Sequence, residues 1–61
     1  MAPNPGHLPP EAAGRRVHVI LRDGYDTRQR EPAGWPADGA RGCNWRIRNF
    51  RADILEWELV L

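Results

Sequence analysis

The stretch that decides the fold is residues 43–61, which read CNWRIRNFRADILEWELVL and hold two of the three Trp of the chain. Successive side chains of a β-strand point to opposite faces, so every second residue shares a face. In residues 43–48 this period places on one face Cys43, Trp45 and Ile47, and on the other Asn44, Arg46 and Arg48. The alternation resumes at residue 54, with one face made of Leu55, Trp57, Leu59 and Leu61, and the other of Ile54, Glu56, Glu58 and Val60.

Two such strands, separated by residues 49–53, predict an antiparallel hairpin. In the expected register Trp45 faces Trp57 and Arg46 faces Glu56. Both Trp side chains should therefore be buried on one face, while the other face pairs Arg46 and Arg48 with the two Glu. A slip by one residue would put Trp among the charges, so the pattern specifies the register.

Residues 15–22, RRVHVILR, predict the first strand, with Val17, Val19 and Leu21 facing the core. Asp23-Gly24 then predicts a turn, and residues 25–27 are compatible with the start of a short strand. Residues 28–42 are rich in Pro and Gly without periodicity, which predicts a long loop that is either mobile or functional. The expected fold class is all-β: a small three-stranded antiparallel meander with one long loop.

The sequence allows two structural interpretations for each of two segments. Trp35 stands between Gly34 and Pro36, either as a plug over the core or as an exposed stacking surface for a base, a sugar or a partner protein. Residues 1–14 hold four of the six Pro and form either a disordered tail or an arm that packs on a neighbouring subunit or rims a pocket. The domain proper is expected over residues 15–61.

Composition narrows the class of protein. A chain of 61 residues with one Cys has no internal disulfide, and Cys43, His7 and His18 do not have the spacing of zinc ligands, so no metal or cofactor is expected. No signal peptide or membrane span is predicted, which favours the cytoplasm. The net charge of +1 argues against general binding of duplex DNA.

Residue types favour binding over catalysis. The chain has no Ser or Lys; His18 has no acid partner in the sequence, and Cys43 falls on the core face, so an enzyme is not expected. Three Trp, one Tyr and nine Arg supply stacking faces and donors to phosphate or carboxylate, although the Arg content also fits a GC-rich genome. The candidate ligand-binding or partner-binding residues are Arg22, Tyr25, Arg28, Trp35, Arg41, Arg46 and Arg48.

The order VHVILRDG (17–24), EPAGWP (31–36), NWRIR (44–48) and DILEWELV (53–60) resembles short phage and prophage proteins. Many of these pair a VxVxLRNG-like first strand with a terminal DIxEWE or DIxAYR strand; here Asp23 replaces the expected Asn. The resemblance covers residues 16–60 and implies a small β fold in a phage setting. It also implies a non-catalytic accessory protein in the host cytoplasm, such as an anti-defence factor that inhibits a host protein.

Two other functions stay open from the residues: a sponge that sequesters a signalling nucleotide, and a protein that binds single-stranded nucleic acid. The expected apolar face is larger than one loop Trp and Leu8 can cover, and leaving several large side chains wet would cancel most of a small domain's stability. The sequence therefore also predicts a homo-oligomer, most simply a two-fold dimer with any ligand site at or beside the subunit boundary.

Overall fold

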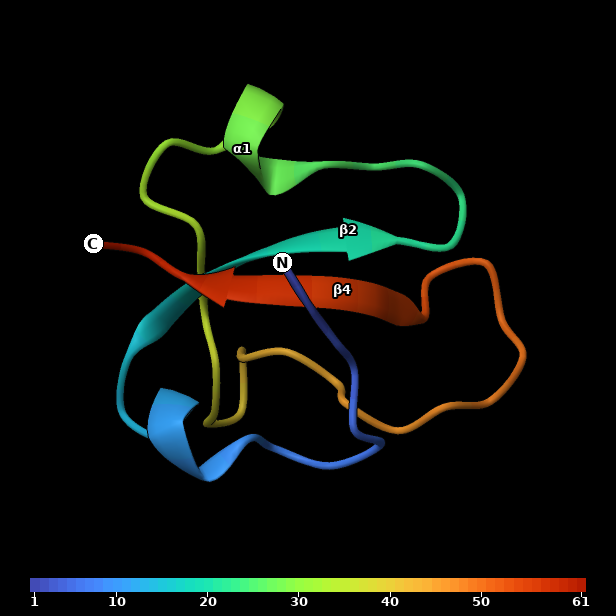
Figure 1. The fold of residues 1–61 in the computed structure, drawn as a ribbon, viewed down its shortest axis with the longest axis horizontal. Helices are drawn as coiled ribbons and strands as arrows, with labels where there is room; N and C mark the ends of the chain where they lie inside the picture. Colours follow the sequence, from blue (N-terminus) through green and yellow to red (C-terminus); the bar gives the residue numbers. More distant parts are fainter.

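The structure, a computed structural model, describes all 61 residues and is mostly β, as the sequence predicts. Its four-stranded sheet is antiparallel, in the order β1-β4-β2-β3 (Figure 1). The strands are β1 (Ala2–Pro3), β2 (Arg16–Leu21), β3 (Trp35–Pro36) and β4 (Ile54–Leu59). Two short helices, η1 (Pro10–Ala12) and α1 (Thr27–Arg30), complete the fold, and neither has the length or apolar character needed to cross a membrane.

The centre of the sheet is the pair β2 and β4. Val17 lies opposite Leu59 and Val19 opposite Trp57, so these side chains share one face. Val17 and Val19 are fully buried, which confirms the core face predicted for the first strand. On the opposite face His18 pairs with Glu58. Both residues are half-buried, as is common for an antiparallel sheet with one face toward solvent.

An irregularity in β4 reverses part of the predicted face pattern. Ile20 pairs with Glu56 and Leu21 with Ile54, which leaves Leu55 as an extra residue in a β-bulge. One extra residue shifts the period of two by one position, so Ile54 is 3% exposed and Leu55 is 44% exposed. The sequence assignment of Leu55 to the core face and Ile54 to the charged face was therefore wrong.

The predicted hairpin is also wrong, because residues 43–48 form no strand. Both edges of β4 are already taken, one by β2 and the other by β1. The segment instead crosses the core face of the sheet, where the Asn4 amide donates to the carbonyl oxygens of Trp45 (3.1 Å) and Ile54 (2.9 Å). Ile47, expected in the core, is 55% exposed.

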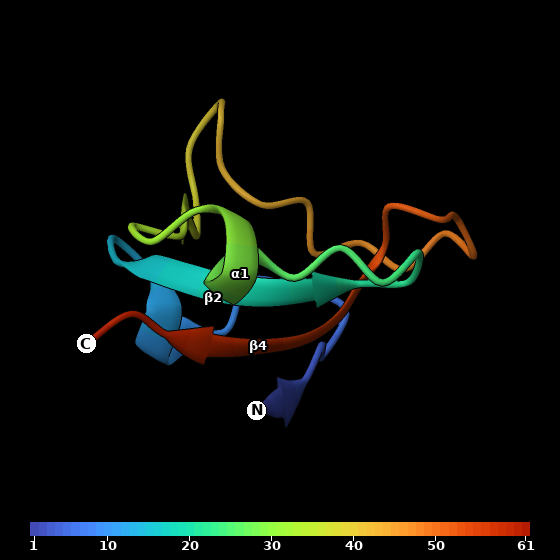
Figure 2. The ribbon, with the colours of Figure 1, turned by 90° about the horizontal axis from the view of Figure 1, so that it is seen from above.

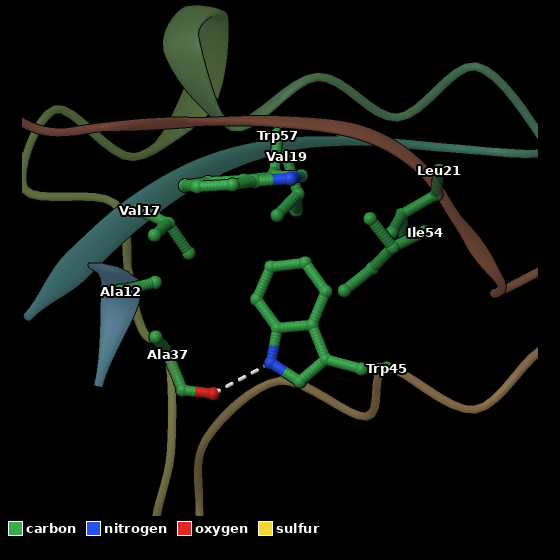
Figure 3. Close-up of a cluster of buried hydrophobic side chains, with 8 residues drawn as sticks. All are labelled: Ala12, Val17, Val19, Leu21, Ala37, Trp45, Ile54 and Trp57. Atoms are coloured by element: carbon green, nitrogen blue, oxygen red, sulfur yellow. Dashed lines mark hydrogen bonds between the residues drawn. The ribbon is translucent and has the colours of Figure 1, made fainter. Parts of the chain in front are cut away.

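The prediction that both Trp are buried on one side of the sheet is confirmed, although Trp45 arrives there from a loop. Trp45 and Trp57 are 5% and 8% exposed and meet edge to face, with ring centroids 5.8 Å apart (Figure 3). The Trp45 indole N–H donates to the Ala37 carbonyl oxygen at 2.8 Å. This bond ties the loop after β3 to the core.

A second layer made of loops covers the core face (Figures 2 and 3). Pro9 and Ala12 from the N-terminal segment are buried, as is Ala37. Leu8 and Cys43 are half-buried and pack against this cluster. The chain's own segments thus cover most of the apolar face that the dimer prediction assumed to be wet; of its predicted members, Ile47, Leu55 and Leu61 are exposed.

Candidate functional site

The structure brings two of the predicted binding residues, Tyr25 and Trp35, into contact with each other. Their rings stack with centroids 5.9 Å apart and an interplanar angle of 22°. One carboxylate oxygen of Glu31 accepts hydrogen bonds from both the Tyr25 hydroxyl (2.7 Å) and the Trp35 indole N–H (2.6 Å). The hydrogen bond to Glu31, followed by burial, raises the pKa of Tyr25 above its usual value.

This arrangement favours one of the two interpretations of Trp35. The ring packs against the edge of the core, and its only donor is already bonded to Glu31. Trp35 therefore closes the core in the manner of a plug, and its stacking partner is Tyr25 of the same chain.

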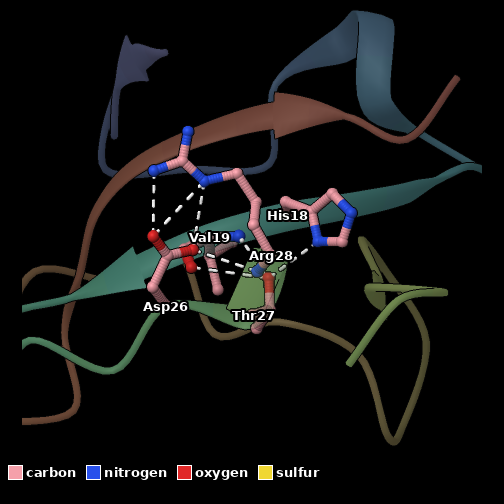
Figure 4. Close-up of polar contacts among 5 residues, drawn as sticks. All are labelled: His18, Val19, Asp26, Thr27 and Arg28. Atoms are coloured by element: carbon pink, nitrogen blue, oxygen red, sulfur yellow. Dashed lines mark hydrogen bonds and ion pairs between the residues drawn. The ribbon is translucent and has the colours of Figure 1, made fainter. Parts of the chain in front are cut away.

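Helix α1 begins beside the outer edge of β2, where it supplies a hydrogen-bond partner for the backbone of that strand (Figure 4). The Asp26 carboxylate caps the helix by accepting from the Arg28 N–H at 3.0 Å. The next side chain, Thr27, is fully buried, and its hydroxyl accepts from the Val19 N–H of β2 at 2.9 Å. A side chain thus replaces a strand on the outer edge of β2.

The same hydroxyl lies 3.0 Å from Nδ1 of His18, a spacing that suits a nucleophile and its base. Thr27 is inaccessible to any substrate because none of its surface is exposed. Its hydroxyl is also held by Val19. The pair of His18 and Thr27 is therefore a structural contact at the sheet edge.

The ion pairs predicted across the hairpin do not form. The one ion pair in the structure joins Arg28 to Asp26, at 2.9 Å. The hydrogen bond between them holds the pKa of Asp26 below its usual value and raises that of Arg28. Arg46 and Arg48, whose expected partners were Glu56 and Glu58, are exposed and have no carboxylate within ion-pair distance.

Several Arg gather at one end of the molecule, where the turn after β2 meets the loop before β4 (Figure 1). The backbones are joined by Arg22 N–H to the Asp53 carbonyl (2.8 Å) and by Asp23 N–H to the Arg51 carbonyl (3.0 Å). We call this surface the arginine end; it consists of Arg22, Arg48, Asn49, Phe50 and Arg51. None of its three guanidinium groups forms an ion pair.

A buried carboxylate holds the loop of the arginine end. Asp53 is 3% exposed, and its Oδ2 accepts from the backbone N–H groups of Arg48 and Phe50, both at 3.0 Å. The N–H groups of the loop, Phe50 first, hold the pKa of Asp53 below its usual value. Between them Asn49 adopts a left-handed φ of 57°, and its side chain accepts from Arg22 at 3.4 Å. The loop is therefore braced from beneath.

The arginine end also exposes an aromatic surface. Phe50 is 50% exposed, and the guanidinium carbon of Arg48 lies 5.5 Å from its ring centroid. Ile47, just before Arg48 in the chain, is exposed as well. Apolar surface beside unpaired Arg is typical of surfaces that bind a partner.

The remaining candidates lie elsewhere. Arg41 is exposed in the turn closed by the Gly42 N–H and the Gly39 carbonyl, away from the arginine end (Figure 1). Burial raises the pKa of the Cys43 thiol to about 11, so it stays protonated at neutral pH. No three His, Cys, Asp or Glu side chains converge to hold a metal ion.

The structure has a single cavity, of about 280 Å³, between the turn after β2 and α1. It is open to solvent and mostly polar. Its lining residues are Asp23, Gly24, Tyr25, Asp26, Gln29 and Arg30.

We compared the chain with known protein families, with curated proteins and with solved structures. None of them matches it. The function is therefore argued from the site alone.

Of the residues predicted from the sequence, Arg22 and Arg48 lie at the arginine end and Tyr25 lines the cavity, but the residues that position them were not predicted. Asp26 before a polar run signalled a helix N-cap, and Asp53 before β4 signalled a capped turn. Glu31 carried no signal, because no regular element was predicted that would bring Tyr25 and Trp35, six residues before it and four after it, to the same carboxylate.

Proposed function

We propose that this chain is a non-catalytic binding protein of phage or prophage origin that acts in the host cytoplasm, and that its arginine end docks onto an acidic surface of a host protein. Inhibition of a host defence protein is the form of this function that we favour. The observation that carries the proposal is the braced loop with three Arg that have no carboxylate partner, beside the exposed ring of Phe50.

Each group that could act in catalysis is engaged in a structural role. This favours a binding function over a catalytic one. The Thr27 hydroxyl satisfies the sheet edge, and Glu31 satisfies two aromatic donors. Asp53 satisfies the loop amides, and Cys43 is protonated and half-buried. Apart from the hydrogen bond from Arg22 to Asn49, the guanidinium groups of the arginine end make no hydrogen bond or ion pair, which supports their use by a partner.

The size of the molecule is compatible with a protein partner. A stable interface takes about 800 Å² from each side. The chain exposes 4134 Å² in total, so a typical interface would use about a fifth of its surface. Arg, with its planar fork of donors, is suited to carboxylates and is enriched among residues that dominate interface energies.

The test is a comparison of two double variants with the same change of charge. Arg48→Ala/Arg51→Ala alters the arginine end, and Arg15→Ala/Arg41→Ala alters exposed Arg that lie outside it. Each tagged protein, checked for folding by circular dichroism, is incubated with host lysate treated with nuclease, and retained proteins are quantified. We expect a host protein that wild type and Arg15→Ala/Arg41→Ala both retain, and that Arg48→Ala/Arg51→Ala loses at least about tenfold.

Equal loss in both double variants would show that only net charge matters, and it would overturn the proposal. Retention unchanged by Arg48→Ala/Arg51→Ala would overturn it as well, because the partner would then bind elsewhere. The absence of any protein retained specifically by wild type would have the same consequence.

A second candidate function, binding of single-stranded nucleic acid, is favoured by Phe50 among unpaired Arg. Such proteins stack bases on aromatic rings while basic groups follow the phosphates, and each stacked base contributes about 1–3 kcal/mol. Fluorescence anisotropy with a labelled oligothymidine tests it. Here we expect weaker binding by Phe50→Ala at constant salt, and an unchanged affinity in that variant would exclude base stacking at this ring.

A further inference from the structure

None of the residues that line the cavity beside Tyr25 belongs to the arginine end, although Asp23 of the lining is bonded to Arg51 and follows Arg22 in the chain. The cavity volume of about 280 Å³ lies just below the range of about 300–1,000 Å³ in which most small-molecule sites fall. It therefore has room for a compact ring system such as one nucleobase. Such sites usually combine an apolar surface with a few polar groups that fix orientation.

Tyr25 is the one hydrophobic residue of the cavity lining, and its ring is the apolar surface that we assign to the site. Trp35 supports one side of this ring, and the guanidinium carbon of Arg30 lies 5.5 Å from its centroid. A base between Tyr25 and Arg30 needs two contact layers of about 3.5 Å each, or about 7 Å. Arg30 must then move outward by about 1.5 Å. It is exposed and its side chain makes no hydrogen bond, so the movement gives up only its contact with the Tyr25 ring.

The polar edge of the cavity offers an acceptor. One oxygen of Asp23, Oδ1, accepts from the Tyr25 N–H at 3.0 Å, which fixes the carboxylate, while Oδ2 makes no hydrogen bond. Asp26, the other carboxylate in the lining, is already bonded to Arg28. A carboxylate with free lone pairs accepts best from two adjacent N–H donors. Guanine has such a pair on one edge, whereas adenine has a single amino group there.

The mouth of the cavity adjoins positive charge. The Asp23 N–H is bonded to the Arg51 carbonyl, and Arg22 precedes Asp23 in the same turn. Neither guanidinium group is paired with a carboxylate. A phosphate attached to a base in the cavity would meet these two Arg, which bind phosphate well.

We propose that this cavity binds a guanine nucleotide. The base stacks on Tyr25 beneath Arg30, its donor edge faces Asp23, and its phosphate lies toward Arg22 and Arg51. The proposal names the ligand class for a nucleotide sponge and does not depend on the host-protein function.

The test is a titration of isotope-labelled protein followed by NMR, with GMP, AMP, guanosine and inorganic phosphate as ligands. We expect GMP to shift the signals of Tyr25, Gln29 and Asp23 and to bind at least about tenfold more tightly than AMP or phosphate. The Asp23→Asn variant should lose this preference for GMP. The control is Asp38→Asn, which alters another exposed Asp that accepts a backbone N–H and should leave it intact.

Three results would overturn the proposal. Shifts produced by GMP only at residues 48–51 would mean that phosphate alone is bound. GMP and AMP with equal affinity would exclude recognition of the base edge, and the absence of any shift at millimolar GMP would exclude the site. None of these results affects whether the Arg48→Ala/Arg51→Ala variant retains a host protein. One proposal can therefore fail without the other.

Discussion

Gly34 is a residue at which the backbone packs tightly against a neighbouring strand. Its φ is +67°, and a Cβ placed there would collide with the Val17 carbonyl oxygen and lie 2.8 Å from Cγ2 of Val60. The close approach lets the chain enter β3 directly beside β2. The residue therefore combines a left-handed backbone with a contact that only Gly allows.

We predict that Gly34→Ala destabilises the fold by about 2–5 kcal/mol, from left-handed strain plus overpacking. The control is Gly14→Ala, because Gly14 has a similar φ of +73° and nothing within 4 Å of the added Cβ. It should lose only about 1–2 kcal/mol. Urea unfolding measures both, and equal losses would contradict the packing argument.

Asp53 makes the stability of the fold depend on pH. Its pKa is lower in the folded protein than its ordinary value of 3.8, because the charged form accepts loop N–H groups. A lowered folded pKa stabilises the fold above the unfolded pKa, and that stability is lost as the pH falls through the folded value. We therefore predict that the urea midpoint falls between about pH 4 and pH 2.

Asp53→Asn should flatten this pH dependence, and Asp38→Asn, at an exposed position, should preserve it. Equilibrium unfolding in urea at a series of pH values provides the comparison. An Asp53→Asn variant with the pH profile of wild type would mean that the loop amides do not stabilise the charged carboxylate.

At the scale of elements, the bulge in β4 decides which side chains enter the core. Ile54 should be the sensitive position and Leu55 the tolerant one, the reverse of a simple period of two. We predict that Ile54→Ala costs about 2–5 kcal/mol and Leu55→Ala less than about 1 kcal/mol. Chemical denaturation of both variants tests this, and a larger loss for Leu55→Ala would mean that the strand is regular.

The two central strands were predictable from sequence because their alternation is a local property. The pairing partner of β4 was not, because two strands can satisfy the same apolar pattern and only the whole fold chooses between them. Residues 43–48 alternate like a strand, yet Trp45 is held by Ala37, which lies in the loop after β3, and by Asn4, which lies far from it in the sequence. The bulge was also hidden, because Leu55, Trp57 and Leu59 alternate with a regular period of two.

At the scale of the whole molecule, the covered apolar face bears on self-association. The dimer prediction required large side chains to remain wet, but Ala12, Ala37 and Trp45 cover them within one chain. The edge strands of the sheet, β1 and β3, are also only two residues long each, and such short edge strands oppose pairing edge to edge.

We therefore expect light scattering at micromolar concentration to give the 7.0 kDa mass of a single chain. A particle of twice that mass would restore the homo-oligomer proposal. It would direct attention to the exposed side chains of Ile47, Phe50 and Leu61 as the surface of association.

The candidate site shows the same division between local and global information. The richness in Arg and aromatic residues was visible in the sequence, and it pointed to binding. The sequence did not show which aromatic side chain packs against the core and which stays exposed. Trp35 is stacked and hydrogen-bonded within the molecule, whereas Phe50, which the sequence analysis did not single out, is exposed. Only the fold places Arg22 beside residues 48–51.

The central claim is that the loop of the arginine end is a braced surface and not a flexible connector. Hydrogen exchange of individual amides, followed by NMR, tests it most directly. The account predicts that the Arg48 and Phe50 N–H groups, although outside any strand, exchange far more slowly than the Arg46 N–H, which is bonded only to the exposed Asn44 side chain. Exchange of Arg48 and Phe50 as fast as that of Arg46 would contradict it.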